Sequence, residues 1–181
     1  MDHLLGTLQQ EIASAAGSLS PEQLSWHRPG KWSIAEILEH LFLTYTGTSK
    51  GLRRVLEAGK PLATAIGWKQ RARAFVVVGL GYMPSGRESP AVARPRGLAP
   101  EKVVGEILAK VAEMDELMTC CEEKFGAGIK LLDHPVLGPC SLNQWRKFHL
   151  VHGRHHVKQI YRLREEIGRQ NLREANAVSG P

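Results

Sequence analysis

Apolar residues recur every three or four positions over four long stretches of the chain, the spacing expected of helices that bury one face. Capping-box patterns, in which a Ser is followed three residues later by Glu or Gln, begin two of these stretches, at Ser33–Glu36 and Ser141–Gln144. The sequence therefore predicts an all-α fold. We expect long helices over residues 2–17, 33–58, 101–125 and 141–168.

The segments between these helices are less regular. We expect a short helical turn after Ser20-Pro21, a basic-then-apolar helix from Trp68 to Leu80, a Pro- and Gly-rich loop from Met83 to Pro100, and a turn from Asp133 to Pro139. No segment shows an alternation that predicts a strand. Four long helices with one long link in the middle predict a four-helix bundle with a crossover between its second and third helices.

Length and composition indicate one soluble globular domain. The 181 residues are 43% apolar and 23% charged. We assign residues 1–170 to the bundle and residues 171–181, which are polar and small, to a flexible C-terminal tail. The start of the chain does not resemble a secretory signal, and the longest apolar run, Ala74 to Met83, is short for a membrane span. We therefore expect a cytoplasmic protein with no membrane partner.

The net charge of +6 permits nucleic-acid binding but does not predict it. The basic residues form two loose groups, Lys69 to Arg73 and Arg162 to Arg173, without the interleaved aromatic residues of a base-reading surface. We expect no nucleic-acid partner. The three cysteines form no C-x-x-C pair and are consistent with a reducing compartment.

Histidines occupy the apolar stripe of the last helix. His149, His152 and His156 stand where Leu or Ile would be expected, whereas His155 lies about 100° away. A buried polar group without a partner costs about 1–3 kcal/mol, and a metal ion removes that penalty by giving neutral ring nitrogens a common partner. His152 and His156, at i and i+4, can both reach one ion.

A third nitrogen donor has two candidates. His40 lies on the buried stripe of the second helix, either as an ordinary core histidine or as the donor that faces the last helix. His149 is the alternative, although three ligands from one straight helix converge poorly. We expect each ligating ring to donate its second N–H to an oxygen acceptor.

Two stretches carry a resemblance to a known family. Trp32-Ser33-Ile34 with Glu36 to Leu41, and His134 to Pro139 with Trp145 and His152 to Ile160, resemble the second-helix and last-helix signatures of the DinB-like superfamily. The similarity covers about residues 1–168. It implies an up-down-down-up four-helix bundle, a divalent metal held by His40, His152 and His156, and a homodimer. The superfamily includes bacillithiol- and mycothiol-dependent transferases, which implies a small-molecule substrate and makes a low-molecular-weight thiol a candidate cosubstrate.

The role of the site has several open alternatives. Nitrogen ligands suit Zn, Ni or Fe, so the ion is not specified. Glu36 is either the capping partner of Ser33 or a catalytic group near the ion. His149 is either a catalytic proton shuttle or a buried histidine bonded to a neighbouring helix. The protein is either a metal-dependent enzyme, a thiol S-transferase or a hydrolase, or a non-catalytic dimeric bundle with a structural or vestigial metal. The apolar run Phe75 to Val78 would pack on a partner chain or cover the pocket.

Overall fold

The computed structural model describes residues 1–65, 67–83 and 89–178, and these residues are mostly helical, as expected. The elements follow one another as α1 (His3–Ala16), α2 (Pro21–Ser25), α3 (Ile34–Ala58), α4 (Trp68–Ala74), a π-helical turn η1 (Phe75–Gly79), a 3-10 turn η2 (Ala91–Ala93), α5 (Pro100–Phe125), β1 (Lys130–His134), β2 (Gly138–Ser141) and α6 (Leu142–Val178).

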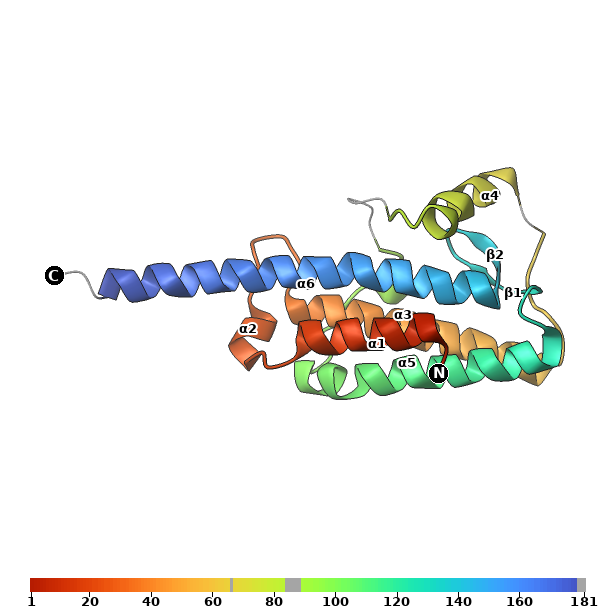
Figure 1. Ribbon diagram of the computed structural model, residues 1–181, viewed down its shortest axis with the longest axis horizontal. Helices are drawn as coiled ribbons and strands as arrows, with labels where there is room; N and C mark the ends of the chain where they lie inside the picture. The colour runs from red at the N-terminus through yellow and green to blue at the C-terminus, as the bar shows by residue number, and fades with distance from the viewer. Residues whose placement is uncertain (66, 84–88, 179–181) are drawn as a thin grey trace.

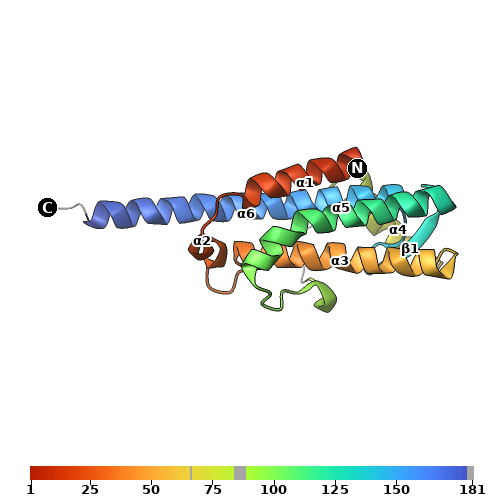
Figure 2. The same ribbon diagram turned by 90° about the horizontal axis from the view of Figure 1, so that it is seen from below.

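The four long helices α1, α3, α5 and α6 lie side by side along the longest dimension of the molecule (Figures 1 and 2). α3 packs mainly on α5, and α1 packs mainly on α6. Their buried stripes form one hydrophobic core, which includes Leu8, Leu38, Met114 and Ile160. The C-terminal part of α6 extends beyond the other helices (Figure 1).

Local sequence signals account for where α3 begins and ends. The Ser33 hydroxyl accepts the Glu36 N–H at 3.1 Å, and the Glu36 carboxylate accepts the Ser33 N–H at 2.8 Å, which completes the expected capping box. Gly59 ends the helix in the left-handed conformation, at φ 64°, which glycine adopts without strain. The expected helical turn after Ser20 is also confirmed as α2.

The last helix is longer than expected. Its start is correct, since Gln144 accepts the N–H of Ser141 at 3.1 Å and α6 begins at Leu142. The predicted end at residue 168 is wrong, because α6 continues to Val178. The physical reason is that residues 169–178 contain no Gly or Pro and include several good helix formers, so that nothing in them stops the helix.

A two-stranded antiparallel hairpin precedes α6, and the expectation of no strands is wrong here. β1 pairs with β2 through Leu132 opposite Cys140, around the turn that the sequence does predict. The hairpin packs on α3 at Gly51, where a Cβ atom would lie 2.4 Å from a methyl carbon of Leu132. His134 stabilises the turn, because its Nδ1 accepts the N–H groups of Val136 and Leu137, both at 3.1 Å.

The crossover from α3 to α5 contains the expected helix over residues 68–80, as α4 followed by η1. The predicted loop from residue 83 to residue 100 holds only η2 within its described part, and residues 84–88 lie outside the described residues. Across the described residues, no helix combines the length and apolar character that crossing a membrane requires.

Candidate metal centre

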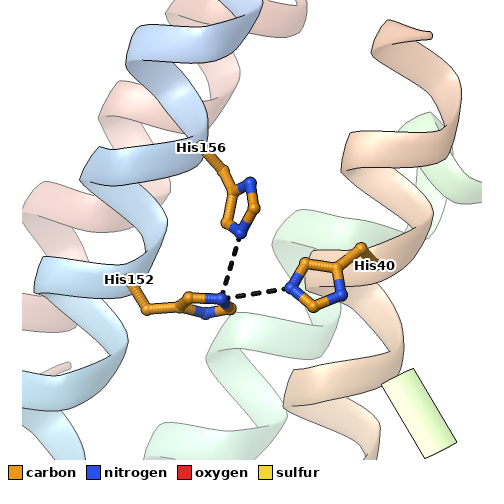
Figure 3. Close-up of side chains that lie close together, drawn as sticks. All are labelled: His40, His152 and His156. Carbon is orange, nitrogen blue, oxygen red and sulfur yellow. Dashed lines mark hydrogen bonds between the residues drawn. The ribbon is translucent and has the colours of Figure 1, made fainter. Parts of the chain in front are cut away.

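Three histidines from two helices meet inside the molecule. His40 comes from α3, and His152 and His156 come from α6 (Figure 3). The Nε2 atom of His152 lies 3.1 Å from the Nε2 atoms of both His40 and His156. All three side chains are buried, with 4%, 9% and 7% of their surface exposed, respectively. Within the described residues, these three are the group of His, Cys, Asp or Glu side chains whose spacing fits a metal ion.

The crossover fixes the orientation of the His40 ring. Its Nδ1 lies 2.7 Å from the carbonyl oxygen of Ala93 and 3.2 Å from the hydroxyl oxygen of Ser89. A carbonyl oxygen only accepts, so Nδ1 carries the proton and Nε2 keeps its lone pair. The ring of Trp32 lies 5.3 Å from the His40 ring, centroid to centroid.

The side-chain amide of Gln159 fixes the orientation of the His156 ring. The Nδ1 atom of His156 donates to Oε1 of Gln159 at 2.8 Å, which leaves the Nε2 lone pair directed at the cluster. The amide nitrogen of Gln159 donates in turn to Nε2 of His155 at 3.1 Å. His155 therefore lies outside the three-histidine cluster, and its contact with the cluster is indirect, through the Gln159 amide.

His152 differs from its two neighbours. Phe148 stacks on its ring, with centroids 5.3 Å apart and planes 10° apart. Its Nδ1 is buried and finds no hydrogen-bond partner among the residues that the structure describes. The expectation that each ring donates its second N–H to an oxygen thus holds for His40 and His156, whereas for His152 no such acceptor is found among the described residues.

Burial keeps all three imidazoles neutral. It lowers the pKa of His40, lowers the pKa of His152 well below its usual value, and lowers the pKa of His156 to about 3. For His152 and His156 the neighbouring rings of the cluster add to the effect. A neutral imidazole is the form that binds a metal, so the rings are in their ligating state near pH 7.

Proton counting shows why a cation fits between these rings. The Nε2 atoms of His40 and His156 both carry lone pairs, and a neutral His152 has at most one proton on its own Nε2. One proton cannot lie along both 3.1 Å contacts, so at least one pair of nitrogens meets lone pair to lone pair. A tetrahedral ion with metal–nitrogen distances of about 2.1 Å separates its ligands by about 3.4 Å, close to the observed spacing.

His149 lies one turn before His152 and outside the cluster. Its side chain is fully buried, and neither ring nitrogen has a hydrogen-bond partner in the described part of the chain. The rings of Tyr45 and Trp145 lie 5.4 and 5.7 Å away, and the Tyr45 hydroxyl and the Trp145 N–H are also buried without partners. Burial lowers the pKa of His149 to about 3. The expected bond to a neighbouring helix is absent among the described residues, and the catalytic role stays a prediction.

Glu36 stands at the first turn of α3, where its carboxylate caps Ser33. This is the structural alternative that the sequence left open, and a catalytic role for Glu36 also stays a prediction. His134 packs on Phe148, with ring centroids 4.3 Å apart, and its Nδ1 is used in the hairpin turn.

Sequence reasoning missed the groups that hold the ligands in place. These are the Ala93 carbonyl, the Gln159 amide and, next to His40 in the chain, the buried carboxylate of Glu39. The Gln159 contact could be predicted from the sequence, because Gln159 follows His156 by three positions on one helix face. The Ala93 carbonyl could not be predicted in this way, because every residue has a backbone carbonyl.

Comparison with known proteins gives one match. The family model of the DinB superfamily matches residues 4–160, which include all three histidines of the cluster. No curated protein and no solved structure matches the chain. Because the family model covers most of its length, the chain belongs to the DinB superfamily.

Proposed function

We propose that this protein binds a divalent metal ion through His40, His152 and His156 and uses it to transfer a small-molecule thiol to an electrophile. The convergence of three neutral ring nitrogens carries the proposal. Three nitrogen ligands leave at least one coordination position for an exogenous group. Zn, Ni and Fe all suit this donor set. When bound, such an ion supplies a Lewis acid that stabilises a thiolate at neutral pH.

The surroundings of the histidines favour thiol transfer over hydrolysis. Hydrolysis by a metal-bound water relies on an effective general base, a role that His, Glu or Asp can fill. The two carboxylates on this part of α3 are engaged elsewhere, Glu36 with Ser33 and Glu39 with backbone N–H groups of the crossover. A thiol loses its proton more readily than water and needs less help from a base.

The cysteines of the chain do not supply this thiol. Cys121 and Cys140 are buried, and burial raises the pKa of both thiols to about 11. Cys120 is exposed on α5 and is not part of the histidine cluster. A cosubstrate such as a low-molecular-weight thiol must therefore bring the sulfur, which agrees with the chemistry that the sequence resemblance implies.

His149 is the residue we propose as the proton acceptor. It is close in the chain to His152, and both of its nitrogens lack partners within residues 1–65, 67–83 and 89–178. Burial lowers its pKa to about 3, so the ring is neutral at pH 7 and would hold a proton only transiently, as a shuttle that passes it on. Glu36 is the second candidate that we propose for a catalytic role, after His149 because its carboxylate is already used in its capping box.

The finer architecture and the assembly are also proposals. The up-down-down-up order is supported by two contacts between α3 and α5, from Cys121 to the Leu52 carbonyl and from Lys124 to the Leu56 carbonyl, which advance in the same direction along both helices. A homodimer is supported by exposed apolar side chains on the crossover. Trp68 is 75% exposed and Phe75 is 64% exposed, whereas Val77 and Val78 face the core.

The experiment that tests this function is a thiol panel with a chromogenic aryl halide as electrophile. Metal-loaded protein should consume thiol and electrophile together, and chelator-treated protein should not. His156→Ala should lose the activity and His155→Ala should keep it. Turnover that is equal with and without metal would refute the proposal. Ester cleavage without thiol would favour a hydrolase, and tight metal binding without any turnover would favour a non-catalytic bundle.

A further inference from the structure

Glu39, the neighbour of His40 in α3, is a buried carboxylate that binds the crossover. Only 2% of its surface is exposed. Its Oε1 accepts the N–H of Arg96 at 2.7 Å, and its Oε2 accepts the N–H groups of Gly97 at 3.1 Å and Leu98 at 3.2 Å. Three consecutive backbone N–H groups thus converge on one carboxylate.

The backbone of this segment is shaped for an anion. Gly97 has φ of 82°, in the left-handed region, and this turns its N–H toward the same side as those of its neighbours. Hydrogen bonds from N–H groups to a charged carboxylate are stronger than those to a neutral acceptor. Nothing lies within 4 Å of a Cβ atom built on Gly97, so the backbone conformation alone requires glycine there.

The same segment holds His40. We call residues 89–98 the clasp, because Ser89 and Ala93 contact Nδ1 of His40 while residues 96–98 donate to Glu39. The Arg96 side chain donates to the Val92 carbonyl at 3.3 Å and so ties the two parts of the clasp together. Glu39 therefore anchors the clasp to α3, and the clasp in turn orients the ring of the adjacent residue, His40.

We propose that Glu39 is a positioning residue for the metal centre, which anchors the clasp so that the Ala93 carbonyl keeps the proton on Nδ1 of His40 and the lone pair on Nε2. The inference rests on the proposed metal site. Without the carboxylate, the N–H groups of residues 96–98 lose their acceptor, the clasp moves away from α3, and His40 can exchange tautomers. A ring with its proton on Nε2 cannot ligate through that nitrogen.

Thermodynamic linkage between metal binding and anchoring of the clasp has a second consequence. If the clasp favours the ligating tautomer of His40, then metal binding favours the anchored clasp by the same factor. The amide hydrogens of residues 96–98 should therefore exchange more slowly in the metal-loaded protein than in the metal-free protein. This coupling passes through the Glu39 carboxylate, which binds the clasp, and the Ala93 carbonyl, which binds His40.

Glu39→Gln tests the proposal, because it removes the negative charge and replaces one of the two accepting oxygens by an NH2 group, which cannot accept an N–H. Gly97→Ala is a second variant that strains the same segment without touching α3. Asp133→Asn is the matched control, since Asp133 accepts the N–H and hydroxyl of Thr64 and so tethers the other end of the crossover. Circular dichroism establishes that each variant is folded.

Three readouts distinguish the outcomes. Proton–nitrogen correlation spectra of the metal-free protein report the His40 tautomer, which should be the Nδ1–H form in wild type and Asp133→Asn and a mixture in Glu39→Gln and Gly97→Ala. Zinc affinity, measured by competition with a chromophoric chelator, should fall about tenfold in the latter two variants only. Amide exchange at residues 96–98 should respond to zinc in wild type but not in Glu39→Gln.

An unchanged tautomer together with a zinc affinity within about twofold of wild type in both variants would overturn the proposal. Failure of the wild-type protein to bind zinc, nickel or iron would instead refute the metal site. The tautomer of the metal-free protein would still decide whether Glu39 and the clasp orient His40, so the two failures are distinguishable.

Discussion

The Nε2 atoms of His40 and His152 lie 3.1 Å apart although 112 positions separate the two residues in the sequence. Two neutral imidazoles normally approach this closely through an N–H to N hydrogen bond. Here the His40 proton is committed to the Ala93 carbonyl, and His156 makes a second 3.1 Å contact with the same nitrogen of His152. A cation that accepts lone pairs from all three Nε2 atoms would explain these short distances.

His149 provides a test that separates function from stability. Its buried nitrogens have no partners, and an unsatisfied buried polar group costs about 1–3 kcal/mol. We expect His149→Leu to raise the unfolding free energy of the metal-free protein by about 1 kcal/mol, to leave metal affinity nearly unchanged and to reduce thiol transfer. Urea denaturation, chelator competition and the thiol assay measure the three quantities. If His149→Leu lowered the unfolding free energy by more than about 2 kcal/mol, the ring would have to make stabilising hydrogen bonds in solution.

His134 provides a test of pH dependence away from the cluster. Burial lowers its pKa from 6.5 to about 4. Because the unfolded chain binds this proton more readily than the folded chain, the stability that neutral His134 contributes is present above pH 6.5 and is lost as the pH falls toward 4.

We therefore expect His134→Asn, which keeps an acceptor for the turn, to flatten the fall in unfolding free energy between pH 6.5 and 4. The difference in slope should approach about 1.4 kcal/mol per pH unit in the middle of this window. Denaturation at several pH values, with chelator present so that metal release does not contribute, provides the measurement. Parallel curves for the two proteins would show that His134 titrates normally.

Gly153 and Gly168 form a matched pair on α6. A Cβ atom at Gly153 would lie 2.2 Å from Cδ1 of the buried Leu8 and 3.4 Å from the Tyr45 hydroxyl, whereas nothing lies within 4 Å at Gly168. Alanine gains about 1 kcal/mol of helix propensity at either position. We expect Gly168→Ala to stabilise the protein by up to that amount and Gly153→Ala to destabilise it by about 1–3 kcal/mol, since overpacking α1 against α6 outweighs the gain. Equal effects in thermal or urea denaturation would contradict the close packing at Gly153.

The long helices could be predicted from the sequence because each buries one stripe of a regular 3.6-residue pattern, as in α3 and α5. The hairpin could not. All four residues of β2 are buried, and β1 has one buried residue, Leu131, among half-buried ones, so neither strand alternates. The polar composition after residue 168 does not mark the end of α6, because polarity alone does not end a helix.

The pair His152 and His156 could be predicted from its spacing on one helix face, while the choice of His40 as their neighbour depended on the family resemblance. Glu39 and the clasp could not be predicted. Their contacts join residues 53 to 59 positions apart through backbone groups, which leave no pattern in the sequence. The stacking of Phe148 on His152 likewise depends on side-chain packing that the sequence does not reveal.

Metal content measured by plasma mass spectrometry tests the central claim most directly. Wild type, His40→Ala, His152→Ala, His156→Ala and His155→Ala are loaded with one divalent metal and dialysed identically. His155→Ala is the matched control, because it removes a histidine from the same helix that lies outside the cluster. The three-histidine site predicts about one equivalent in wild type and His155→Ala and near-complete loss in the other three variants. Retention of a full equivalent by His152→Ala would contradict it.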